Sequence, residues 1–179
     1  MMVTATSFHS TDRRQNKPAL PPYCFTMSDG VFYYKDVPIA EMTRIESFSA
    51  SHRLHNPELT DARNVEMFGK CNNPNGHGHN YKWEVTLRGP VKPTSGMVYD
   101  LADLKQEMGF VLSIVDHKNL DLDVPYFREG KHVSTTENLA VFLYDTLKAN
   151  MGQPQMLKKV KLWETDKNVF TYKGVHTPE

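Results

Sequence analysis

The stretch 71–79 (CNNPNGHGH) places a thiol, Cys71, six residues before the first of two histidines, His77 and His79. The Asn, Pro and Gly residues between them favour bent backbone, so the chain can turn back and bring Cys71 towards the histidines. If a strand begins here, His77 and His79 leave the same face, because strand side chains alternate. A third ligand would then complete a catalytic zinc site with one open position.

His52 is the candidate third ligand. It follows Phe48 and Ala50 at a spacing of two, so all three side chains share one face of a strand. His55 lies three residues further on and is the alternative. Three imidazole nitrogens suit zinc and leave the fourth position for water or a substrate oxygen. An H-x-H pair alone is more often an ordinary turn into a strand, so the prediction depends on the combination with His52 and Cys71.

The sequence leaves the role of Cys71 open. A base or nucleophile needs a lowered thiol pKa, which Lys70, a metal or a histidine could provide. As a fourth zinc ligand, Cys71 would close the site and make it structural. The third alternative is an inert buried thiol, the commonest fate of a lone cysteine.

Further acids and bases stand at the ends of predicted elements. Asp116 and His117 end an apolar helix, either as a favourable helix terminus or as an acid–base pair. Because adjacent side chains do not readily face each other, we expect Asp116 to orient another group. Glu164 shares a strand face with Val160 and Leu162, where an unpaired acid is costly to bury. We therefore expect Glu164 to pair with a ligand or base.

Alternation predicts strands over residues 43–52, 79–87, 159–164 and 169–173, the second ended by Gly89-Pro90. Helical spacing follows an N-cap at Asp100, and a second helix follows the sequence STTE at 134–137. That sequence fits a capping box with Glu137 as its acid. The order of two strands, two helices and two strands predicts an α+β fold with both helices on one face.

The chain of 179 residues fits one domain, which we expect over residues 42–179 after an N-terminal extension, 1–41. Up to about residue 22 the extension is basic and polar, and we expect it to be disordered. Zero net charge argues against nucleic acid or membrane partners. Two cysteines, Cys24 and Cys71, fit a reducing compartment, so we expect a cytoplasmic location, with organelle import by the tail as the alternative.

Residues from about 42 to 174 resemble the 6-pyruvoyltetrahydropterin synthase family. The resemblance rests on the ordered motifs FSASHRL, FGKCNNPNGHGHNY, SGMVYDLADLK, DHKNLD, VPYF, STTEN and WETDKN. It implies the T-fold, a four-stranded antiparallel sheet backed by two helices. In that family trimers close into a barrel, two trimers stack as a homohexamer, and active sites lie between subunits.

The resemblance also implies a reaction, the conversion of 7,8-dihydroneopterin triphosphate to 6-pyruvoyl-tetrahydropterin with elimination of triphosphate, by a carbon–oxygen lyase of tetrahydrobiopterin biosynthesis. The cofactor would be one Zn²⁺ per subunit, with Mg²⁺ a further candidate requirement. The implied zinc ligands are His52, His77 and His79. By the same resemblance, Cys71 matches the base, and Asp116 and His117 match the pair that activates it from a neighbouring subunit. Glu164 matches the residue that anchors the pterin ring. A pterin-contacting segment is matched by Thr135, Thr136 and Glu137.

Two rival functions stay in view. A 6-carboxytetrahydropterin synthase uses the same precursor, but proteins that resemble it carry a shorter spacing than the five residues between Cys71 and His77. The other rival is a non-catalytic protein in which Cys71 completes a structural zinc site. The triphosphate contacts are not indicated by the motifs, and Lys70, Arg53 and Lys82 are candidates by charge alone.

Overall fold

The computed structural model describes residues 24–28, 31–34 and 36–176, and the chain divides into two compact units, Met1–Val37 and Pro38–Glu179. In the first unit, β1 (Cys24–Ser28) and β2 (Val31–Tyr34) form an antiparallel pair. The tail up to residue 22, for which we expected disorder, lies outside the described residues.

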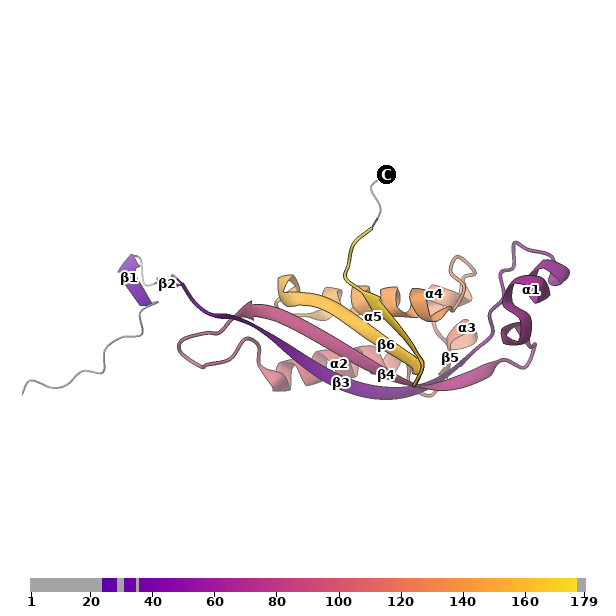
Figure 1. Cartoon of the computed structure of the whole chain (residues 1–179), viewed down its shortest axis with the longest axis horizontal. Helices are drawn as coiled ribbons and strands as arrows, with labels where there is room; N and C mark the ends of the chain where they lie inside the picture. Colours follow the sequence, from indigo (N-terminus) through magenta and orange to yellow (C-terminus); the bar gives the residue numbers. More distant parts are fainter. Residues whose placement is uncertain (1–23, 29–30, 35, 177–179) are drawn as a thin grey trace, which may run out of the picture. The chain divides into compact units, whose positions relative to one another are not determined.

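The second unit is built on a sheet with strand order β5-β3-β4-β6-β7 (Figure 1). Its four longer strands are antiparallel, as predicted: β3 (Ile39–His52), β4 (His77–Pro90), β6 (Leu157–Thr165) and β7 (Asn168–Tyr172). The fifth strand was not predicted. It is the two-residue β5 (Lys118–Asn119), which pairs parallel to β3 beside Ala50 and Ser51.

The β3–β4 ladder is the longest pairing in the sheet and ends at the candidate metal site. It runs in unbroken register from Ile39 opposite Pro90 to His52 opposite His77. The sequence predicted that Gly89-Pro90 would end the strand. In the structure both residues belong to β4. Pro90 is tolerated because it is the last residue of the strand. The alternation of burial along both strands confirms the predicted period of two.

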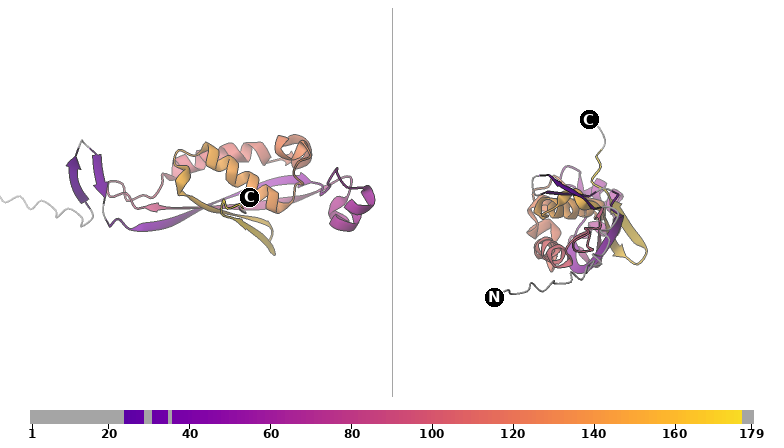
Figure 2. Two further views of the ribbon diagram at one scale, coloured as in Figure 1. Left: turned by 90° about the horizontal axis from the view of Figure 1, so that it is seen from above. Right: turned by 90° about the vertical axis from the view of Figure 1, so that its left-hand side faces the viewer.

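Helices α2 (Leu101–Val115) and α5 (Thr136–Asn150) lie together on one side of this sheet (Figure 2). Asp100 caps α2 as predicted, its side chain accepting a hydrogen bond from the backbone N–H of Ala102 at 2.8 Å. The buried stripes of both helices pack with Tyr81, Trp83 and Leu162 of the sheet in one hydrophobic core. This packing holds the strand ends that carry the candidate site.

The predicted capping box of α5 is wrong by one residue. Thr135, not Ser134, is the N-cap, and its hydroxyl accepts a hydrogen bond from the backbone N–H of Asn138 at 3.3 Å. Glu137 is exposed in the first turn, where its charge favours the helix dipole, but it does not occupy the capping position. The shift frees the backbone carbonyl of Ser134 for another contact.

Short helices complete the unit. They are α1 (Asp61–Phe68), the 3₁₀ turn η1 (Gly69–Asn72), α3 (Leu120–Asp123), α4 (Pro125–Arg128) and the 3₁₀ turn η2 (Pro154–Met156). The first two lie between β3 and β4, and α3 and α4 follow β5 (Figure 1). Within the described residues, no helix has the length and apolar character to cross a membrane.

Candidate metal centre

Three imidazoles meet where the β3–β4 ladder ends. His52 and His77 are direct partners in the register, and His79 lies two residues further along β4 on the same face. One nitrogen from each ring lies within 4.8 Å of the others, and the Nε2 atoms of His52 and His77 are 3.1 Å apart. His55, the alternative ligand, is outside this group and contacts the Asn72 side chain instead.

Hydrogen bonding prepares the His52 ring for a metal. Its Nδ1 lies 2.6 Å from the backbone oxygen of Ser134, which can only accept, so Nδ1 carries the proton and Nε2 has a free lone pair. Among the described residues, the buried Nε2 atom of His79 has no hydrogen-bond partner. Nitrogens bound to tetrahedral zinc lie about 3.3 Å apart, close to the His52–His77 separation. The three histidines therefore fit a zinc ion.

Burial keeps His52 and His79 in the neutral form that can bind a metal. It lowers the pKa of His52, with the neighbouring His77 and His79 acting in the same direction and the Ser134 carbonyl opposing. Burial also lowers the pKa of His79, against the opposing charge of Glu164. A lowered imidazole pKa extends the neutral, metal-binding form to lower pH.

The turn before His77 requires glycine. Gly76 has φ +68°, and a Cβ atom there would lie 2.9 Å from the backbone oxygen of His52. A side chain would therefore combine an unfavourable left-handed conformation with a collision against the chain that carries another histidine of the site. Gly76 lets the two strand ends approach closely enough for the rings to meet.

Cys71 lies in η1 and is partly buried, with its backbone oxygen accepting a hydrogen bond from Leu54 N–H at 2.9 Å. Among the described residues, the group of possible metal ligands consists of the three histidines and does not include Cys71. This arrangement favours an open site over a closed structural one.

Asn72, next to Cys71, is a structural residue that sequence reasoning missed. It is 5% exposed, its amide donates to the Leu54 carbonyl at 2.7 Å, and its oxygens accept from the Arg53 guanidinium. These bonds tie η1 to the chain that follows His52. The only signal in the sequence was its place in the turn-rich stretch CNNPNG, which gives no hint of burial.

The side chains of Asp116 and His117 face each other. The expectation that these adjacent side chains would not do so was wrong. His117 has φ +57°, and this turn of the backbone brings its Nδ1 within 2.9 Å of Asp116 Oδ1. The same carboxylate oxygen accepts a hydrogen bond from Ser49 N–H at 2.9 Å. That backbone N–H lowers the pKa of Asp116, and His117 adds to the effect. Asp116 is therefore held ionised beside an exposed imidazole.

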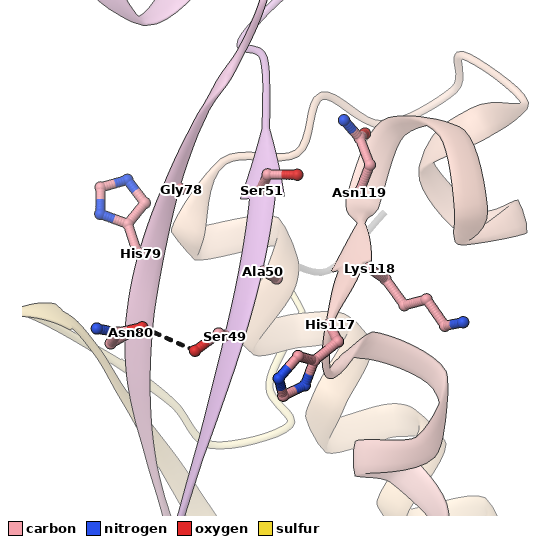
Figure 3. Close-up of a pocket in the computed structure, with 9 residues that line it drawn as sticks. All are labelled: Ser49, Ala50, Ser51, Gly78, His79, Asn80, His117, Lys118 and Asn119. Carbon is pink, nitrogen blue, oxygen red and sulfur yellow. Dashed lines mark hydrogen bonds between the residues drawn. The ribbon is translucent and has the colours of Figure 1, made fainter.

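The His117 ring lies at a shallow pocket of about 400 Å³, on the other side of the β3–β4 pair from the His79 ring (Figure 3). The pocket is lined by Ser49, Ser51, His79 and Asn80 of the strands and by His117, Lys118 and Asn119 of the neighbouring segment. Of the three clustered histidines only His79 lines this pocket, so within the described residues of one chain His52 and His77 lie outside the cavity that His117 lines.

Glu164 is paired, as expected. Its Oε1 accepts a 2.5 Å hydrogen bond from the Thr136 hydroxyl and lies 3.8 Å from His79 Nε2. Tyr81 is buried beside them, and burial, with the charge of Glu164, raises the pKa of its hydroxyl. The matching parity of Tyr81 and His79 in the sequence could have identified this neighbour. Thr135 uses its hydroxyl as the helix cap, and Glu137 is exposed.

Comparison with known proteins agrees with this geometry. Residues 41–175 match the family described as 6-pyruvoyl tetrahydropterin synthase. The chain is 60% identical over 138 residues to a protein from Caenorhabditis elegans named putative 6-pyruvoyl tetrahydrobiopterin synthase, covering 77% of this chain and 97% of that one. It is 54% identical to the human 6-pyruvoyl tetrahydrobiopterin synthase, covering 75% and 92%.

A more distant relative and a solved structure indicate the same family. The 6-carboxy-5,6,7,8-tetrahydropterin synthase of Aquifex aeolicus is 30% identical over 159 residues, covering 74% of this chain and 97% of that one. The solved structure of the C. elegans 6-pyruvoyl tetrahydropterin synthase superposes with a TM-score of 0.76 at 60% identity, covering 78% and 98%. Its fold, the T-fold, is the one that the resemblance implied. The chain belongs to the 6-pyruvoyl tetrahydropterin synthase family.

Proposed function

We propose that this protein is the lyase that converts 7,8-dihydroneopterin triphosphate to 6-pyruvoyl-tetrahydropterin, releasing triphosphate, in tetrahydrobiopterin biosynthesis. The observation that carries the proposal is the three-histidine cluster, within a chain 60% and 54% identical to proteins named for this synthase. The pairing of Glu164 with Thr136 beside the cluster adds a polar contact suited to a pterin ring.

The proposed metal is Zn²⁺, one per subunit, held by His52, His77 and His79, with Mg²⁺ as a further requirement for activity. When bound, zinc supplies a Lewis acid for the oxygens of the pterin side chain. Cys71 is the proposed base that removes a proton from that side chain. Its position outside the ligand set supports this role, because a metal-bound thiolate could not also act as base.

The proposed pterin anchor is Glu164, whose carboxylate can accept hydrogen bonds from ring N–H groups. Thr136 holds one carboxylate oxygen at 2.5 Å and leaves the other for the ligand. Thr135 and Glu137 are the other proposed contacts of this segment. Because Thr135 is the helix cap and Glu137 is exposed, their contacts to substrate would be weaker than that of Glu164.

The proposed acid–base pair, Asp116 and His117, acts on Cys71 of a neighbouring subunit. The His79 and His117 rings lie on opposite sides of the β3–β4 pair (Figure 3), which supports a site that a neighbouring subunit completes. We propose the assembly of the family, trimers that close a barrel and stack as a homohexamer. Joining sheets edge to edge would also cover the outer strands of each one. We propose a cytoplasmic location without nucleic acid or membrane partners.

The experiment that tests this function is turnover of 7,8-dihydroneopterin triphosphate by the full chain with Zn²⁺ and Mg²⁺, with the pterin product identified by mass. We expect stoichiometric triphosphate release and a pyruvoyl product. A carboxy product would assign the activity named for the A. aeolicus relative. No turnover with zinc bound would contradict both and leave a non-catalytic zinc protein.

A further inference from the structure

A second cavity, of about 420 Å³, lies beside the metal centre. Its wall includes Arg53, which follows His52 in the chain, and Gly76, which precedes His77. The opposite wall comes from the segment of α3 and α4, including Asp121 and Arg128. The cavity is therefore lined by the immediate chain neighbours of two of the three clustered histidines.

The charge of the cavity favours an anion. Its charged lining residues are two arginines, Arg53 and Arg128, and one acid, Asp121. The acid is partly compensated, because its Oδ2 accepts a 2.5 Å hydrogen bond from the backbone N–H of Arg53. Two guanidinium groups remain, and guanidinium is the side chain best shaped to bind phosphate oxygens.

Arg53 is held in place yet keeps donors for a ligand. Its Nε donates to the backbone oxygen of Asn72 at 2.9 Å, and its Nη2 donates to the Asn72 side-chain oxygen at 3.2 Å. These two bonds fix the plane of the guanidinium and use two of its five N–H groups. The remaining N–H groups of Arg53 are therefore held in a fixed orientation before a ligand binds, which lowers the entropic cost of binding.

The neutral side chains of the cavity also supply donors. The Asn72 amide fixes His55, because its N–H donates to His55 Nδ1 at 3.1 Å and so places the ring proton on Nε2. The Asn119 side-chain oxygen already accepts from the N–H groups of Asp121 and Leu122, which leaves its amide hydrogens available. The cavity therefore presents mainly hydrogen-bond donors, which is the chemistry of an anion site.

We propose that this cavity binds the triphosphate group of the substrate, with Arg53, Arg128 and His55 as its main donors. The inference rests on the proposed function, in which the pterin side chain at the metal is joined to a triphosphate that leaves. Of the other residues considered from the sequence, Lys82 lies over the Trp163 ring, and Lys70 lines a neighbouring cavity that Arg53 also lines. The site is thus distinct from the pterin contacts at Glu164.

The test measures binding of inorganic triphosphate to the full, zinc-loaded chain by calorimetry, for wild type, Arg128→Gln and Arg63→Gln. Arg128 is exposed in α4, so its replacement does not disturb the core. Loss of one charge-assisted contact is expected to weaken triphosphate binding about tenfold. Arg63 lies on α1 outside the cavity and pairs with Glu66, so Arg63→Gln serves as the matched control and should bind like wild type.

A parallel titration with 7,8-dihydroneopterin, which lacks phosphate, should give the same affinity in all three proteins. Triphosphate binding that is absent in wild type, or unchanged in Arg128→Gln, would overturn the proposed site. If the wild-type chain turns over the pterin triphosphate in that case, the proposed function stands and only the cavity assignment fails. If turnover fails but triphosphate binding depends on Arg128, the cavity assignment stands as a polyphosphate site.

Discussion

The Nδ1 atom of His52 lies 2.6 Å from the backbone oxygen of Ser134, a residue 82 positions later in the chain. This bond joins the end of β3 to the start of α5. It fixes the tautomer of the ring and directs Nε2 to the other histidines, as outer hydrogen bonds commonly do for metal-binding imidazoles. The three-histidine cluster is therefore built by the packing of helix on sheet as well as by the β3–β4 ladder.

The first prediction concerns the ligand set. Replacing His77 with Ala removes one of three nitrogens and should reduce bound zinc from one per chain to well below one after dialysis. Replacing His55 with Ala should leave the zinc content unchanged, because that ring lies outside the cluster. Metal analysis of the purified proteins checks both. Full zinc in His77→Ala, or loss in His55→Ala, would contradict the assignment.

The second prediction compares two glycines with nearly the same backbone angle. Gly76 has φ +68° and Gly96 has φ +70°, but an added Cβ would meet the His52 oxygen at 2.9 Å only at position 76. Gly96→Ala should lower the free energy of unfolding by about 1 kcal/mol, the cost of left-handed backbone. Gly76→Ala should cost more and also weaken zinc binding. Urea unfolding measures the difference, and equal costs would exclude the collision.

The third prediction concerns pH. The pKa values of His52 and His79 are lowered in the folded chain, mainly by burial. Below the unfolded value, about 6.5, the unfolded chain therefore binds more protons than the folded one. The metal-free protein should be most stable above that pH and lose stability as the pH falls towards 5.

Urea unfolding of the metal-free chain across this range tests the pH prediction. His52→Asn should flatten the dependence, since it removes one of the titrating groups. His132→Gln, at an exposed histidine, should keep the wild-type slope. Stability that increases on acidification would show that the buried rings are not the groups that control it.

The fourth prediction tests Thr136 as the residue that positions Glu164. Thr136 is 3% exposed, so Thr136→Val keeps the buried shape but removes the 2.5 Å hydrogen bond to Glu164 Oε1. We expect KM for the pterin substrate to rise about tenfold, the loss of one hydrogen bond to a charged group, with zinc content unchanged. Thr146→Val, on the same helix, is the control. An unchanged KM would leave Thr136 with a purely structural role.

Much of the fold could be predicted from local patterns. Alternation from Phe48 to His52 and from His79 to Leu87 identified the two strands of the site, because one face of each is buried. The same parity placed His52, His77 and His79 on matching faces. The register that sets His52 opposite His77 was not predictable, since it depends on pairing across an intervening 24-residue segment, 53–76.

Other features depended on three-dimensional context. The sequence STTE predicted Ser134 as the cap, but the structure uses Thr135, which leaves the Ser134 carbonyl to His52. The contact between Asp116 and His117 required a positive φ at a histidine, which no local pattern indicates. The short strand β5 was likewise not predictable, because two residues are too few to show a period.

The measurement that tests the central claim most directly is zinc content together with turnover for Cys71→Ala. An open three-histidine site with Cys71 as base predicts one zinc per chain, as in wild type, and triphosphate release reduced by at least about a hundredfold. Loss of zinc in Cys71→Ala would make the thiol a ligand and the site a closed, structural one. Full turnover with zinc bound would remove Cys71 from the chemistry.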